Sequence, residues 1–483
     1  MQIQNKFMLL VAATCLVFSL QCSNNPASAQ SAKLSDMQNR IQSISSVVSS
    51  LRGLNFIRPV HAGLITRAQY AKNTAQDINS GLTSIEQNAL SKEYAQMGCL
   101  AETDTPIGQI LTNYYTGFPA AYYVTGTDSL YVLTDETNND TDLNVYISHE
   151  LTHALQDQNL GMDFSVLPSY SLYNSDAYLG HTSLLEGDAT FTEYNYLVDV
   201  YYQESNPYVV TSPISLKVKS YFLSANDSTI QRPFFLEVKG AYPYDVGWAY
   251  IADLFYESQW SAVNARYSIA TIPKSSAEIN REAPFTPLYF DFHSIQSLLA
   301  AQSGGIVFSD DDNGGFALML GLFYGQLDTQ RVNRSLDWSG DRYTFVMRTG
   351  QSYGTLVWAM AFSTTDAANY MFSNFDKLIR SRMLGGKSPY YSSVDSATDS
   401  VSQGMAYTYS SSVFTTRLIR TANQIWWLDH TDSLTQPIIA ALAQQQPTLA
   451  LAKLSAVLPI HPTLLASRKH SVDSQLKPLI SLL

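Results

Sequence analysis

Apolar residues recur at helical spacing in two stretches of this chain. Over residues 31–54 they fall three and four positions apart, and over residues 147–155 they fall at every fourth position. Such spacing places apolar side chains on one face of an amphipathic helix. For the second helix, Asn139–Asp142 offer N-cap residues and Gly161 a stop signal. We therefore predict both helices and expect the first to pack on the unit that contains the second.

The same reasoning predicts the other elements. Helical patterns cover residues 68–78, 84–97, 182–202 and 246–259, and extended runs cover residues 62–66, 343–348 and 355–362. Residues 120–134 are rich in Tyr, Val and Leu on both sides of Gly126-Thr127-Asp128, which is typical of a β-hairpin. The fold class is thus α+β and mostly helical.

Five regions follow from these elements. They are a leader over residues 1–29, a helical region over 30–118, a core over 119–302, an α+β region over 303–440 and a helical tail over 441–483. A turn-rich break at residues 303–315 separates the core from the α+β region. Its acidic run, Asp310–Asp312, lacks the spaced ligands and the terminal Glu of an EF-hand calcium loop. We interpret it as a solvated loop, with calcium binding as the alternative.

The leader has the features of a signal peptide. Lys6 is the only charge before an apolar run over residues 7–20, which is short for a membrane span. Ala27-Ser28-Ala29 fits the small-x-small rule for cleavage, and lipidation at Cys22 is the alternative. The chain is therefore expected to be exported to the periplasm or the extracellular space, with a lipid at Cys22 as its only route to a membrane.

Charge and cysteine content narrow the function classes. Without Lys6 the net charge of −12 becomes −13, which argues against nucleic acid or an anionic membrane as a partner. Of the three cysteines only Cys99 follows the expected cut, so no internal disulfide can form. We interpret Cys99 as a buried structural residue, with inhibitory ligation of a metal as the alternative.

The central helix carries His149-Glu150-Leu151-Thr152-His153, a His-Glu-x-x-His motif. Imidazoles four residues apart share a helix face and can bind one metal ion, with Glu150 beside them. The alternative is a solvated helix face or a pair of core histidines.

A catalytic zinc site usually has three protein ligands. Position 159 is Asn, so the third ligand comes from elsewhere, and the best candidate is Glu186 on the next helix. Gly187 and Ala189 are small enough for two helices to approach each other around a metal. Asp157, one turn after His153, is better explained as a packing acid than as a ligand.

The run from His149 to Gln158, followed by Leu185-Glu-Gly-Asp-Ala-Thr190, resembles a group of exported bacterial zinc metallopeptidases related in pattern to the gluzincins. The resemblance implies a zincin-like core with an active-site helix and a preceding hairpin or small sheet. It also implies Zn²⁺ bound by His149, His153 and Glu186, with Glu150 as the general base. Gluzincins often carry an acid where this chain has Thr190, so the groups around the ligands differ here.

The leading hypothesis is an exported zinc-dependent metallopeptidase that acts on a peptide or protein substrate. A zinc-activated water would attack the peptide bond, and Arg342 and Tyr343 are candidate donors to the oxyanion. For these two residues the alternative is a core Tyr343 and an ion pair between Asp341 and Arg342. The alternative function is a catalytically inactive zincin-fold binding or scaffold protein of the cell envelope.

Overall fold

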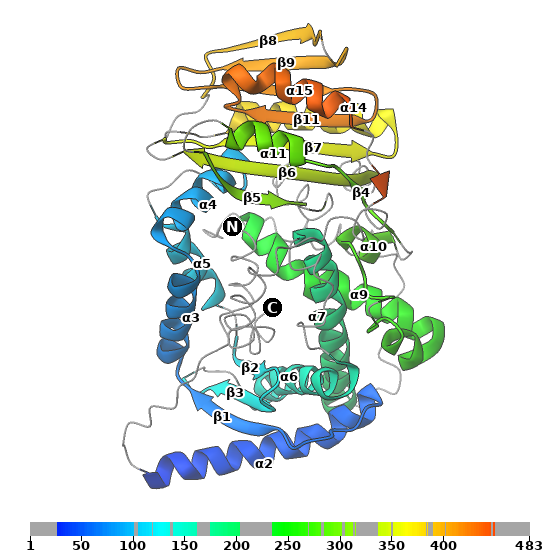
Figure 1. Ribbon diagram of the computed structural model, residues 1–483. Helices are drawn as coiled ribbons and strands as arrows, with labels where there is room; N and C mark the ends of the chain where they lie inside the picture. The colour runs from blue at the N-terminus through cyan, green and yellow to red at the C-terminus, as the bar shows by residue number, and fades with distance from the viewer. Residues whose placement is uncertain are drawn as a thin grey trace, which may run out of the picture.

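The computed structural model describes residues 27–100, 105–117, 119–135, 139–161, 174–202, 234–268, 270–281, 285–301, 305–312, 314, 337–348, 351–382, 384, 390–400, 402–445 and 448–449. It shows an α+β protein that is mostly helical, as the sequence predicts (Figure 1). Residues 1–26 of the expected leader, with Cys22, lie outside the described residues, as does most of the expected helical tail, and the last three residues of the leader belong to the first described helix. None of the helices that the structure describes has both the length and the apolar character needed to cross a bilayer.

The helices are α2 (Ala27–Arg52), α3 (Arg67–Gly81), α4 (Ser84–Gln96), α5 (Ile107–Tyr115), α6 (Asp140–Leu160), α7 (Ser175–Leu197), α9 (Phe234–Asn264), α10 (Ser276–Arg281), α11 (His293–Ala300), α14 (Thr365–Ser381) and α15 (Thr435–Ala443). A π-helical turn, Val198–Tyr202, follows α7, and a 3-10 turn, Asp432–Leu434, precedes α15.

The strands are β1 (His61–Ile65), β2 (Ala121–Val124), β3 (Ser129–Leu133), β4 (Leu288–Tyr289), β5 (Gly305–Asp311), β6 (Trp338–Arg348), β7 (Thr355–Phe362), β8 (Ser393–Thr398), β9 (Met405–Ser410), β10 (Thr415–Arg420), β11 (Gln424–Asp429) and β12 (Thr448–Leu449).

The expected hairpin is confirmed as part of a small three-stranded sheet. Strands β2 and β3 pair antiparallel with Tyr123 opposite Leu130, and β1 adds to β3 in parallel, so the order is β1-β3-β2. Apolar side chains of this sheet, of α2 and of α6 form one core, in which Ile44, Val48 and Leu151 are buried. The N-terminal helix therefore packs on the unit that contains the His-Glu-x-x-His helix, as expected.

A seven-stranded antiparallel sheet forms the other end of the molecule (Figure 1). Its order is β5-β6-β7-β11-β10-β9-β8. Every residue of β7 is buried because Trp358 and Met360 face the core with α4, α5 and α14, while Val357 and Ala359 face the core with α11 and α15. Because both faces of β7 are buried, its sequence is a continuous apolar run and does not alternate between apolar and polar residues.

Helix α7 runs from the large sheet to α6 (Figure 1). The sequence places its start near Thr182, but the helix begins at Ser175, capped by the Asn174 side chain, which accepts from the Ala177 amide. Helix α7 packs closely on α9 at Gly187. A Cβ atom at this position would lie 2.2 Å from the Gly247 carbonyl carbon, so the two helices can approach this closely only where the residue is glycine. The expected small-residue approach therefore exists, but it is between α7 and α9.

The interpretation of Asp310–Asp312 as a solvated loop is wrong. Residues 305–311 form the edge strand β5, and Asp311 is fully buried. The Asp311 carboxylate accepts hydrogen bonds from the Ser175 amide at 2.9 Å and the Ser175 hydroxyl at 2.5 Å. Buried polar groups require such partners, and these bonds attach the start of α7 to the sheet. Among the described residues, this acidic run forms no group that could hold a metal ion.

A buried carboxyl group on α4 provides a second link between the helices and the large sheet. Glu93 accepts hydrogen bonds from the Tyr343 hydroxyl of β6 at 2.9 Å and from the Ser309 hydroxyl of β5. Burial raises the pKa of Glu93 to about 8, although both hydroxyl groups act in the opposite direction. Glu93 is thus protonated in the native protein at pH values where an unfolded chain has lost the proton.

This shift predicts that stability falls as the pH rises through the interval between the unfolded and folded pKa values of Glu93. Between about pH 5 and pH 8 the native state binds more protons at this site than the unfolded state, with a loss on the order of a few kcal/mol. We expect Glu93→Gln, which keeps a neutral side chain, to flatten that decline in urea unfolding at pH 5 and pH 8. The exposed Glu257→Gln on α9 serves as the control, and an equally steep decline in Glu93→Gln would contradict the assignment.

Candidate metal centre

Helix α6 presents the two histidines because its ends are fixed locally. The Asn139 side chain caps its N-terminus by accepting from the Asp142 amide at 2.9 Å. Gly161 ends it in the left-handed conformation at φ 68°, where a residue without Cβ is favoured. Both caps are those expected from the sequence. His149 and His153 then lie one turn apart on the buried face of the helix.

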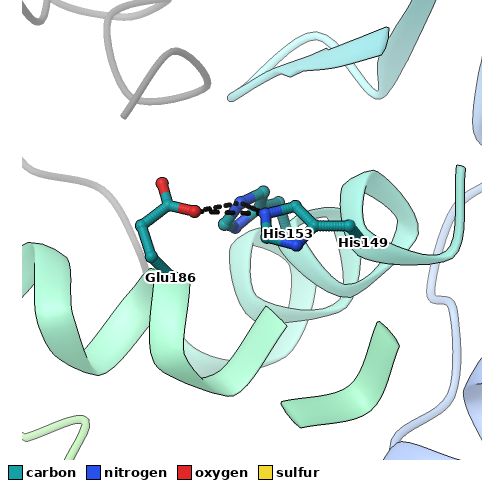
Figure 2. A group of neighbouring side chains, drawn as sticks. All are labelled: His149, His153 and Glu186. Atoms are coloured by element: carbon teal, nitrogen blue, oxygen red, sulfur yellow. Dashed lines mark hydrogen bonds and ion pairs between the residues drawn. The ribbon is translucent and has the colours of Figure 1, made fainter. Parts of the chain in front are cut away.

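Glu186 of α7 meets these two imidazoles (Figure 2). The His149 Nε2 atom lies 3.1 Å from His153 Nε2 and 3.1 Å from Glu186 Oε2, and His153 Nε2 lies 3.3 Å from the same oxygen. All three side chains are buried, and together they form a group that could hold a metal ion. The structure thus brings together the three residues that the sequence singles out as metal ligands.

The hydrogen bond that each imidazole makes through Nδ1 determines that its Nε2 atom faces Glu186. His149 Nδ1 lies 2.8 Å from Glu193 Oε2, and His153 Nδ1 lies 2.9 Å from Gln156 Oε1. A carboxylate and an amide oxygen only accept hydrogen bonds, so each Nδ1 carries the hydrogen. The Nε2 atoms of the neutral rings therefore present lone pairs toward Glu186 Oε2. Three acceptor atoms that face one another require a positive charge between them.

The spacing of these three atoms fits a tetrahedral cation. Bonds of about 2.0–2.1 Å at tetrahedral angles separate neighbouring donor atoms by about 3.3 Å. The three separations here are 3.1, 3.1 and 3.3 Å.

Protons supply the positive charge in the metal-free protein. Burial by itself would lower the pKa of both histidines. The Glu186 carboxylate, joined at His149 by Glu193, has the larger effect, so the pKa of each histidine is raised. Against its own desolvation, Glu186 has its pKa lowered to about 2 by His153 and His149. A metal ion would replace these protons, because ligands must be deprotonated to bind it.

Glu150 lies beside this group rather than in it. Its Oε2 atom accepts a hydrogen bond from the Tyr123 amide of β2 at 2.7 Å. Burial raises the pKa of Glu150 to about 7, while the charges on His149 and His153 oppose the rise. Oε2 is occupied by the strand, and the structure therefore fixes Glu150 between the edge strand and the two histidines.

Tyr244 of α9 lies next to the same group. Its ring stacks on the His149 imidazole with centroids 5.8 Å apart and planes 23° apart. Burial, together with the nearby charges of Glu186 and Glu150, holds the pKa of Tyr244 well above its usual value. Tyr244 is therefore a neutral hydrogen-bond donor at the edge of the metal group.

The structure does not bring Arg342 and Tyr343 to this centre. Both are on β6 in the large sheet, which lies apart from α6 (Figure 1). Arg342 pairs with Asp310 at 2.7 Å and with Asp312 at 3.1 Å, and the fully buried Tyr343 donates to Glu93. Their expected role as oxyanion donors is thus corrected. Tyr343 is a core residue, and Arg342 pairs with acids other than Asp341.

Asp157 and Cys99, which the sequence singled out, have the structural roles expected of them. Asp157 accepts from the Tyr123 hydroxyl at 2.7 Å and the Gly126 amide at 2.8 Å, which confirms it as an acid that packs α6 on the hairpin. His181 is fully buried in α7, outside the metal group, and burial lowers its pKa to about 3. Cys99 is a buried free cysteine in the core below the large sheet.

Sequence reasoning gave no role to three residues that contact the ligands, namely Glu193, Gln156 and Tyr244. Glu193 falls seven residues after Glu186, so helical spacing does place it on nearly the same face of α7. Gln156 follows His153 by three residues on α6. Tyr244 had no local signal, because its position depends on how α9 crosses α7.

Comparison with known proteins adds no family to these observations. No protein-family model matches the chain, and neither does any curated protein or solved structure. The resemblance to zinc metallopeptidases therefore remains a prediction from the two motifs, and the geometry of the centre carries the functional argument.

The contact of His149 with Glu193 generates a prediction. Partners that orient ligating histidines typically contribute 10–100-fold in metal affinity. We expect Glu193→Gln to weaken zinc binding about tenfold, measured by competition with a chromophoric chelator. Asp199→Asn, an exposed acid in the turn after α7, is the matched control. Equal affinities for parent and Glu193→Gln would show that Glu193 does not support the ligand.

Proposed function

We propose that this chain is an exported zinc-dependent peptidase. The observation that carries the proposal is the placement of Glu150, a carboxylate adjacent to the three-ligand group yet outside it. A purely structural tetrahedral zinc site is closed by four protein ligands, whereas a catalytic one has three and keeps an open position. Among the described residues the group has three members. Export rests on the leader pattern of the sequence.

Zinc is the metal that this donor set favours. Two imidazole nitrogens and one carboxylate oxygen form a His₂Glu set, and their near-tetrahedral spacing suits an ion without a geometric preference of its own. Magnesium and calcium instead favour sites built from oxygen atoms. Bound here, zinc would supply Lewis acidity that lowers the pKa of a water molecule and polarises a carbonyl group.

The residues around the group suit the remaining steps of peptide hydrolysis. Glu150 would accept a proton from the attacking water at Oε1, because Oε2 is already bonded to the Tyr123 amide. The same carboxyl group would then deliver the proton to the leaving amine. Tyr244 is the donor best placed to stabilise the developing oxyanion, since its protonated hydroxyl is next to Glu186.

Strand β2 supports a peptide as the substrate class. It is an edge strand of the small sheet, and its Tyr123 amide points away from β3 toward Glu150. An extended peptide could add to such an edge through the backbone groups of β2 other than the Tyr123 amide, which Glu150 occupies, and would then lie beside the metal group.

Two variants test the proposal. We expect one zinc per chain in the parent and in Glu150→Gln, and little zinc in Glu186→Ala, because only the second change removes a ligand. On a library of fluorogenic peptides, Glu150→Gln should reduce kcat by about 10²–10⁴-fold, the usual contribution of a general base.

The outcomes separate the proposal from its alternative. Stoichiometric zinc without hydrolysis that depends on Glu150 would favour a binding or scaffold protein of the cell envelope. A parent chain that takes up no zinc after reconstitution would contradict both.

A further inference from the structure

A continuous series of buried and partly buried hydrogen bonds leads from the metal group to the N-terminal helix. Gln156, which contacts His153, also donates through Nε2 to the Tyr267 hydroxyl at 3.0 Å. Tyr267 donates to Asp188 Oδ2 at 2.6 Å. Asp188 in turn accepts from Arg52 Nε at 2.7 Å and from Arg52 Nη2 at 2.9 Å. Four segments far apart in the sequence thus meet in one network.

The two ends of this series fix the role of every group between them. The Arg52 guanidinium can only donate and the Asp188 carboxylate can only accept, so the Tyr267 hydroxyl gives its hydrogen to Asp188. Its oxygen lone pair then accepts from the Gln156 NH₂ group.

The orientation of the Gln156 amide, which is often ambiguous, is determined here. Its NH₂ group faces both Tyr267 and the Leu185 carbonyl oxygen, which lies 3.0 Å away. The amide oxygen must therefore face His153 Nδ1 at 2.9 Å. That contact requires a hydrogen on Nδ1 and leaves the lone pair of Nε2 directed at the metal group.

Arg52 is itself held in place by several contacts. Arg52 and Asp188 are both fully buried, and an unpaired charge at either position would be strongly destabilising. The guanidinium lies 4.1 Å from the ring centroid of Trp260 and donates to Asn264 at 2.8 Å. The Trp260 indole also donates to the Leu51 carbonyl oxygen at 2.7 Å, so the last turn of α2 is attached to α9.

We propose that Arg52, Asp188, Tyr267 and Gln156 form a positioning relay that fixes the tautomer and orientation of His153 and thereby couples docking of α2 to metal loading. The inference rests on the metal-binding part of the proposed function and not on hydrolysis. Because coupling free energies are reciprocal, zinc tightens the attachment of α2, and loss of the relay weakens zinc binding.

Tyr267→Phe tests the relay with the smallest change, because it removes one hydroxyl and leaves the Arg52–Asp188 pair intact. We expect zinc affinity in chelator competition to fall about tenfold. Tyr250→Phe is the matched control, since the buried Tyr250 hydroxyl of α9 has no hydrogen-bond partner among the described residues. Equal affinities for Tyr267→Phe and Tyr250→Phe, whether unchanged or equally reduced, would overturn the relay.

Two further readouts distinguish positioning from general stability. In the metal-free protein, ¹⁵N chemical shifts of His153 should report a single Nδ1–H tautomer when the ring is neutral, and a measurable share of the other tautomer in Tyr267→Phe, where only the Leu185 carbonyl still orients the Gln156 amide. In the parent, zinc should slow amide hydrogen exchange in the last turn of α2, and this effect should diminish in Tyr267→Phe.

The failure modes are separate. If the parent protein bound no zinc, the proposed function would be contradicted. The tautomer measurement on the metal-free protein would still decide whether the relay fixes His153. A mixed His153 tautomer in the parent itself would overturn the relay whatever the zinc affinity.

Discussion

Three hydrogen-bond acceptors meet at one buried point, and this arrangement is stable only with a positive charge between them. His149, His153 and Glu186 each direct an acceptor atom inward, while Glu193 and Gln156 occupy the outer nitrogens of the two rings. In water, the acceptor atoms of these three side chains would each be hydrated and would not stay close together. The fold must therefore hold α6 and α7 together against this cost, and much of the surrounding structure serves that purpose.

Helix α7 is held by polar contacts at its start and by close packing in its middle. At its start, the Ser175 amide and hydroxyl bind Asp311 of the large sheet, and Asp176 accepts from the Ser276 amide of α10 at 3.0 Å. At its middle, the backbone of Gly187 touches α9, one residue after the ligand Glu186. Anchors on both sides limit the motion of α7, so the ligand oxygen is presented at a defined distance from α6.

The buried acids of this protein are stabilised in two different ways. Asp188 is matched by a guanidinium, which preserves its charge in a dry environment. Glu93 accepts hydrogen bonds from two hydroxyl groups, and burial raises its pKa to about 8. Asp188 thus keeps its charge through an ion pair near the metal group, whereas Glu93, between α4 and the large sheet, is held as a protonated carboxyl.

The sequence by itself determined α6, its two caps and the shared face of His149 and His153, because these depend on spacing within a few turns. It also indicated Glu186, since the chemistry demanded a third ligand and the next helix offered a carboxylate. Only the tertiary structure decided that Glu193 and Tyr244 surround the ligands and that Arg342 lies in the distant sheet. Those positions depend on how the helices cross and on the order of the strands in the sheet. Both are determined by packing between segments that are far apart in the sequence.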